Sequence, residues 1–138
     1  MEFGGSRSLD SAGGFEKMEA GLNARAIDYA KLGQLFLDGG QWNGRQLISR
    51  QWVELATGQN PAGWAPAFDA RTFYGFMWWG VRRPDGTADF YAAGGHGEYL
   101  HISPSNDVVI VRMGVNFGIA SDRWIEGFTR AADELGRG

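Results

Sequence analysis

Apolar residues recur along the chain at spacings that predict three helices, over residues 24–38, 50–57 and 121–135. Each helix is expected to begin after or at a side chain that favours an N-cap, namely Asn23, Ser49 and Ser121. Glycines follow the first two helices, where a residue with positive φ is favoured. The third helix carries its apolar side chains on one face, which indicates that it covers a sheet: Trp124, Ile125, Phe128, Ala131, Ala132 and Leu135.

Between the second and third helices the pattern changes to that of β-strands. Strands are expected over residues 73–79, 88–93, 98–103 and 108–113, with turn-forming residues between them. Connections this short join antiparallel neighbours, because parallel strands need long crossovers. The run 108–113 is almost wholly apolar, which predicts a strand that is covered on both faces. These patterns favour an α+β fold, in which an antiparallel sheet is covered by helices.

The remaining segments set the domain limits. Residues 1–22 are polar and glycine-rich without sustained periodicity, so we expect an irregular lead-in followed by a single domain over residues 23–138. A length of 138 residues is typical of one domain. The segment 58–71 contains prolines and glycine and is expected to be a loop, with Trp64 and Phe68 packed against the domain.

Composition and charge narrow the classes of function. A net charge of -3 argues against nucleic-acid binding, and no window approaches the ~18 apolar residues that a membrane span needs. The chain has no cysteine, which excludes disulfides and thiolate chemistry. Its 22 glycines are about twice the average usage of ~7%, which favours a turn-dense domain or one built around a pocket. The first ten residues lack the regions of a signal peptide, and the sequence leaves the compartment open.

The residues predict neither a metal nor another cofactor. His96 and His101 are the only histidines, and Glu98 lies between them. On a strand, His96 and Glu98 share one face and His101 points to the other, so three ligands do not converge. The glycine-rich segment 94–97 precedes a strand, so it lacks the helix N-terminus with which such loops bind phosphate.

Local motifs for a serine nucleophile are missing from this sequence. It contains no G-x-S-x-G, no S-x-x-K and no Y-x-N. Ser103, His101 and Asp107 are the residue types of a triad, but neighbours on one strand and turn do not give triad geometry, and we reject this set.

Three separated blocks nevertheless resemble one family. They are GLNARAIDYAKLGQLFLDGGQWNGRQLISRQWVELAT at 21–57, YGFMWWG at 74–80 and AAGGHGEYLHISPSNDVVIVRMG at 92–114. In this order they resemble the serine β-lactamase-related hydrolases, and most of all the class C-like and 6-aminohexanoate-dimer hydrolase branch. The resemblance extends from about Ser8 to the end of the chain.

The resemblance implies the C-terminal part of a β-lactamase/transpeptidase-like fold and a serine hydrolase that cleaves amides or esters through an acyl-enzyme. The family carries its nucleophile in S-x-x-K, followed by Y-x-N. Since this chain has neither, we expect a partial domain that is inactive alone, and no catalytic residue is assigned within it. A small-molecule amide or ester substrate is expected for the full-length hydrolase.

The same resemblance locates the candidate site. The family's third motif, K-T-G or H-x-G on a sheet strand, is best matched by Ala92 to Gly94, and the Gly95 N–H would then be an oxyanion donor. His96 and Trp78 are expected to form the pocket wall. Ala92 replaces the cationic or imidazole residue expected in the motif, and Glu98 stands where this branch often has glutamine.

The sequence is also consistent with a non-enzymatic function. The glycines at 94, 95 and 97 would also suit a simple tight bend. A sheet with an open edge and an exposed apolar face would favour self-association or a complementing chain, as in a split hydrolase or an interaction domain.

Overall fold

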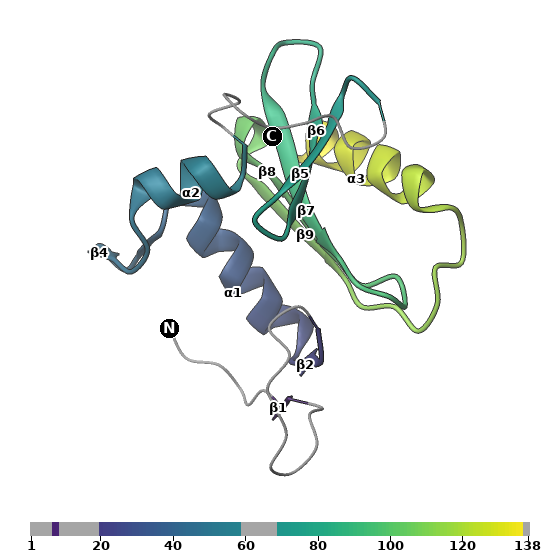
Figure 1. Cartoon of the computed structure of the whole chain (residues 1–138), viewed down its shortest axis with the longest axis horizontal. Helices are drawn as coiled ribbons and strands as arrows, with labels where there is room; N and C mark the ends of the chain where they lie inside the picture. Colours follow the sequence, from purple (N-terminus) through teal and green to yellow (C-terminus); the bar gives the residue numbers. More distant parts are fainter. Residues whose placement is uncertain (1–6, 9–19, 59–68, 137–138) are drawn as a thin grey trace.

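The computed structural model describes residues 7–8, 20–58 and 69–136 (Figure 1). Its largest unit is a five-stranded antiparallel sheet in which each strand pairs with the next one along the chain. The strands are β5 (Thr72–Gly75), β6 (Trp78–Arg82), β7 (Ala88–Ala93), β8 (Tyr99–Ser103) and β9 (Val108–Arg112). A 3-10 helix, η1 (Pro104–Asn106), joins β8 to β9. The predicted antiparallel sheet is confirmed.

Helices cover both faces of this sheet (Figure 1). They are α1 (Ala26–Leu37), α2 (Arg50–Ala56) and α3 (Ser121–Leu135). The first two lie on one face, and α3 lies on the other. Two further strand pairs are short: β1 (Arg7–Ser8) with β2 (Leu22–Asn23), and β3 (Gln41–Trp42) with β4 (Arg45–Gln46). The predicted α+β class is confirmed.

Only one of the three predicted N-caps is correct. The Ser49 side chain accepts a hydrogen bond from the first turn of α2, as expected. In contrast, Asn23 belongs to β2, and α1 begins after Arg25, whose side chain makes no capping bond. The N-cap of α3 is Ala120, so Ser121 is already helical. These two helices therefore begin without a capping side chain.

The segment predicted as one strand over 73–79 is a hairpin. Phe76 and Met77 form the two-residue turn between β5 and β6, with φ values of 47° and 72°. Hairpin turns with positive φ at both central positions usually contain Asn and Gly, because bulky side chains rarely adopt this conformation. Phe76 and Met77 are not turn-forming residue types, so the apolar pattern of the sequence does not mark this turn.

The larger core cluster lies between the sheet and the two N-terminal helices, and it contains Phe36, Val53, Ala56, Trp78, Phe90, Leu100 and Ile102. Helix α1 approaches the sheet closely at Gly33. A Cβ at this position would lie 2.6 Å from Cγ1 of Val109 and 2.9 Å from Cδ1 of Leu100. Because Gly33 has no side chain, α1 can pack directly against β8 and β9.

The opposite face of the sheet is covered by α3. Tyr91, Tyr99 and Phe128 are buried there, and Trp124 and Ile125 pack against them. The predicted apolar stripe is therefore correct, except for Leu135, which is 65% exposed.

Strand β9 has helices on both faces, as its apolar run predicted. Val109 packs with the cluster under α1, and Ile110 packs with the cluster under α3. Helix α1 supplies the first of these covers and α3 supplies the second. All five residues of β9 remain half-buried, since no strand pairs with its outer edge within the described residues.

Candidate functional site

The candidate site is the turn that joins β7 to β8, where the sequence predicted the third motif. Ala92 lies near the end of β7, and the turn begins at Gly94. The Gly94 N–H donates to the Glu98 carbonyl oxygen at 2.8 Å, and the Gly97 N–H donates to the Gly94 carbonyl oxygen at 3.2 Å. These two bonds close the turn and leave Gly95 at its tip.

Gly95 combines an exposed backbone with an unused donor. Its N–H has no hydrogen-bond partner among the described residues. A Cβ built on Gly95 would meet no atom within 4 Å, and its φ is not positive. The position therefore presents a free backbone N–H, the kind of donor that oxyanion holes use, and it has space for a small side chain.

Glu98 fixes the shape of the turn from inside. Its Oε2 atom accepts the His96 N–H at 3.0 Å. The turn is closed so tightly on this carboxylate that a Cβ at Gly94 would lie 2.5 Å from Oε2. The side chain of His96 is exposed, and its role as a pocket wall stays a prediction.

Tyr29 of α1 lies near the same carboxylate. Burial raises the pKa of the Tyr29 phenol, and the negative charge of Glu98 raises it further. The phenol donates a hydrogen bond of 2.6 Å to the Leu22 carbonyl oxygen. Sequence reasoning missed this neighbour, because nothing in the local pattern links the first turn of α1 to the glycine turn.

The two adjacent tryptophans occupy opposite faces of β6. Trp78 is 8% exposed and packs in the core against Phe36 and Phe90, with ring centroids 4.8 and 5.3 Å away. Trp79 is half-buried on the face of α3 and stacks on Tyr91. The structure thus gives Trp78 a core position, and its role as a pocket wall stays a prediction.

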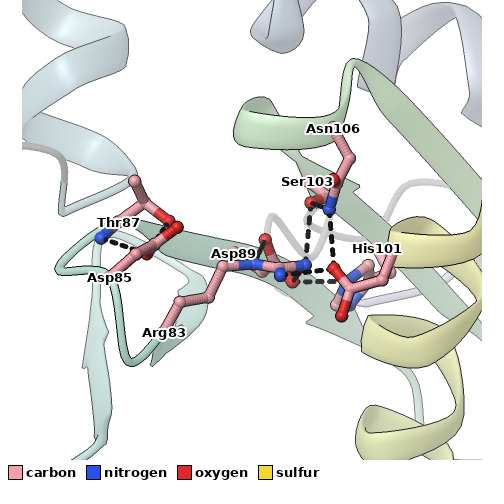
Figure 2. A network of polar contacts seen from close by, with 8 residues as sticks. Arg83, Asp85, Thr87, Asp89, His101, Ser103 and Asn106 are labelled. Carbon is pink, nitrogen blue, oxygen red and sulfur yellow. Dashed lines mark hydrogen bonds and ion pairs between the residues drawn. The ribbon is translucent and has the colours of Figure 1, made fainter. Parts of the chain in front are cut away.

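A second polar cluster lies within the fold, and the sequence analysis did not find it (Figure 2). The Arg83 guanidinium donates two hydrogen bonds to Asp89, from Nε to Oδ1 at 2.8 Å and from Nη2 to Oδ2 at 2.9 Å. It also reaches Asp133 of α3 at 2.6 Å and the Ser103 hydroxyl at 3.2 Å. Asn106 donates to the Ser103 hydroxyl at 3.0 Å. One arginine therefore ties β7, β8 and α3 together.

Asp89 is fully buried and ionised in this cluster. Burial alone would raise the pKa of the carboxyl, but hydrogen bonds from His101, Arg83 and Ser103 outweigh it and lower the pKa below its usual range. The Nε2 atom of His101 lies 3.3 Å from Asp89 Oδ2, whereas Nδ1 has no hydrogen-bond partner among the described residues. Nε2 is therefore the ring nitrogen that faces the carboxylate.

This cluster is structural and does not provide a nucleophile. Ser103 and His101 are both 0% exposed, and the His101 ring packs between Tyr91 and Phe128. The acid next to His101 is Asp89, so the set with Asp107 that we rejected from sequence does not assemble. A signal was available in the sequence, because Asp89 and His101 are polar residues inside two strands that are mostly apolar.

The described ranges contain no group of three His, Cys, Asp or Glu side chains that is placed to hold a metal ion. None of the helices in these ranges has the length and apolar character that crossing a membrane requires.

Similarity to known proteins agrees with the resemblance seen in the sequence. The chain is 34% identical over 106 residues to the 6-aminohexanoate-dimer hydrolase of Paenarthrobacter ureafaciens, a match that covers 72% of this chain and 26% of that protein. A solved structure from Bacillus anthracis, provisionally named as a 6-aminohexanoate-dimer hydrolase, superposes with a TM-score of 0.71 at 29% identity and covers 86% of this chain and 31% of its own. No protein-family model matches the chain.

These similarities support a relationship to the β-lactamase-related hydrolases, which the three sequence blocks predicted. Both of the similar proteins described above carry the name 6-aminohexanoate-dimer hydrolase. The chain spans about a quarter of the length of the curated relative and about a third of the solved structure.

Proposed function

We propose that this chain is part of a serine hydrolase that cleaves amide or ester bonds, and that it supplies one oxyanion donor and part of the pocket wall. The free, exposed N–H of Gly95 is the observation that carries the proposal. Backbone N–H groups aimed at developing negative charge are the usual donors for acyl transfer, and removing one typically costs ~10²–10³ in kcat.

The proposed reaction passes through an acyl-enzyme. A serine oxygen attacks the substrate carbonyl carbon, and its proton passes to a base. The carbonyl oxygen becomes an anion, to which Gly95 donates its N–H. Collapse of the tetrahedral intermediate expels the amine or alcohol, and water then hydrolyses the serine ester. His96 is proposed to limit the pocket beside this oxygen, and Trp78 to support the wall from the core.

The nucleophile is proposed to come from residues other than these 138, because this sequence has no S-x-x-K and no Y-x-N. The chain alone is therefore expected to be inactive. The curated relative is named for a 6-aminohexanoate dimer, so linear amides are the first substrate class to test.

A chimera tests the proposal. The segment of the Paenarthrobacter ureafaciens hydrolase that aligns with this chain is replaced by this chain, and labelling with a fluorophosphonate probe is measured. We expect labelling of the chimera at its S-x-x-K serine and turnover of the 6-aminohexanoate dimer. The isolated chain should show neither labelling nor hydrolysis of nitrocefin or p-nitrophenyl acetate, and stoichiometric labelling at any of its own serines would contradict the proposal.

A second candidate function is a non-catalytic interaction, and the outer edge of β9 favours it. This edge has no paired strand among the described residues, and β9 leads into a segment with four exposed apolar side chains. These are Met113, Val115, Phe117 and Ile119, at 48%, 88%, 42% and 50% exposure. An open edge beside apolar surface suits strand addition, by a second copy or by a complementing chain. Light scattering tests it: a mass that grows with concentration supports association, and a constant monomer mass contradicts self-association.

A further inference from the structure

One arginine connects the glycine turn with two other parts of the molecule. Arg112, the last residue of β9, donates from Nη1 to the Gly97 carbonyl oxygen and from Nη2 to the Asn116 carbonyl oxygen, the latter at 3.2 Å. Its guanidinium carbon lies 4.2 Å from the ring centroid of Trp124 in α3. The turn, the segment after β9 and the helix therefore meet at a single side chain.

Two glycines leave the space that this side chain occupies. A Cβ on Gly97, whose φ is 80°, would lie 2.6 Å from Arg112 Nη1 and 2.7 Å from the Asn116 carbonyl oxygen. A Cβ on Gly114 would overlap the Arg112 guanidinium and lie 2.5 Å from the His96 carbonyl oxygen. The backbone thus closes on Arg112 from both sides.

Ion pairing does not account for this placement. Among the described residues, Arg112 has no carboxylate within salt-bridge distance, whereas Arg83 binds two. The partners of Arg112 are two neutral carbonyl groups and an aromatic face. The planar guanidinium of arginine has several N–H donors in fixed directions, so it can bind two carbonyl oxygens at once. A lysine ammonium lacks this fixed geometry.

We propose that Arg112 is the positioning residue of the glycine turn. By holding the Gly97 carbonyl against the Asn116 carbonyl, it fixes the turn so that the Gly95 N–H keeps one direction. The effect of Arg112 on catalysis rests on the proposed function. If the Gly95 N–H is an oxyanion donor, moving it by about 1 Å can cost ~10²-fold in rate. The clamp itself is a property of this chain and can be measured without any reaction.

Amide hydrogen exchange, followed residue by residue by NMR on the full chain, tests the clamp. Arg112→Met keeps an unbranched apolar stem against Trp124 and removes every donor. We expect the Gly97 N–H to exchange at least about tenfold faster in this variant, while the amides within β7 and β8 stay within about twofold. Arg112→Lys keeps the charge without the fork and should recover less than half of the protection. Arg82→Met is the matched control, since Arg82 also lies over an aromatic ring, 5.1 Å from the Phe73 centroid, but does not contact the turn.

Three results would overturn the proposal: unchanged exchange at Gly97 in Arg112→Met, equal acceleration across the whole sheet, or full recovery by Arg112→Lys. In the chimera, Arg112→Met is expected to lower kcat by about 10- to 100-fold with KM within about threefold. If exchange at Gly97 accelerates as expected but loss of the Gly95 N–H leaves acylation unchanged, the proposed function fails while the positioning role of Arg112 stands.

Discussion

The replacement Arg83→Met should destabilise the chain strongly, because it leaves a buried carboxylate without its cation. Asp89 is 0% exposed, and Arg83 holds both of its oxygens at 2.8 and 2.9 Å. After the change, the side chains of His101 and Ser103 are the partners that remain for this charge among the described residues.

The magnitude follows from the burial of the pair. Breaking a buried ion pair by removing one partner costs about 3–5 kcal/mol. The bond to Asp133 adds little, since that side chain is 36% exposed and partly exposed pairs contribute ~0–1 kcal/mol. We therefore expect a loss of about 4 kcal/mol at pH 7, a large share of the ~5–15 kcal/mol that holds a typical domain together.

The pH dependence gives an independent check of the same reasoning. The folded pKa of Asp89 is lowered, so its contribution to stability is present above the unfolded value of ~3.9 and is lost as the pH falls through the folded value. In Arg83→Met, the hydrogen bonds from Arg83 no longer oppose burial, so the pKa of this carboxyl should be higher than in the parent. The variant can then bury Asp89 as a neutral acid. The difference in free energy of unfolding between parent and variant should therefore become smaller as the pH falls from 7 to about 3.

Urea unfolding, followed by tryptophan fluorescence at both pH values, measures these quantities. Asp133→Asn is the matched control and should cost no more than about 1 kcal/mol. A loss below about 1 kcal/mol for Arg83→Met at pH 7 would refute the reasoning, and so would a deficit that does not change with pH.

Three further predictions concern the turns and one buried phenol. Gly97→Ala should lower the free energy of unfolding by about 1–3 kcal/mol in urea melts, since φ is 80° and the added Cβ meets Arg112; no loss would contradict this. A double variant with Phe76→Asn and Met77→Gly should raise the free energy of unfolding by about 1 kcal/mol, because both positions have positive φ; a lower free energy would show that the exposed side chains stabilise the turn. Burial, with a smaller effect of Tyr99, raises the pKa of Tyr91 to about 12, so one tyrosine should titrate there by ultraviolet absorbance, and Tyr91→Phe should remove that transition.

The parts of the fold that rest on repeating patterns were predictable from the sequence. Both limits of β7 and the end of α3 match the predicted ranges, because apolar periodicity and flanking turn residues mark them. The face of α3 that packs on the sheet was also predicted, since it follows from the position of apolar side chains around one helix.

The parts that depend on long-range contacts were not predictable. The hairpin at Phe76 and Met77 breaks the usual residue preferences, so its turn is imposed by the pairing of β5 with β6. The cluster around Arg83 joins residues 50 positions apart, and no local pattern encodes that distance. For the candidate site, the sequence indicated the glycine turn by resemblance, but the clamp by Arg112 depends on how three separate segments meet.

The acylation rate of Gly95→Pro in the chimera tests the central claim most directly, because proline removes the N–H that is proposed to bind the oxyanion. Circular dichroism must first show that the variant is folded. Gly95→Ala is the control: it keeps the N–H, its φ is not positive and its Cβ meets open space, so it should retain most of the rate. We predict that folded Gly95→Pro acylates at least about 10²-fold more slowly than the parent chimera. Acylation of folded Gly95→Pro at the parental rate would contradict the assignment of the oxyanion donor to this turn.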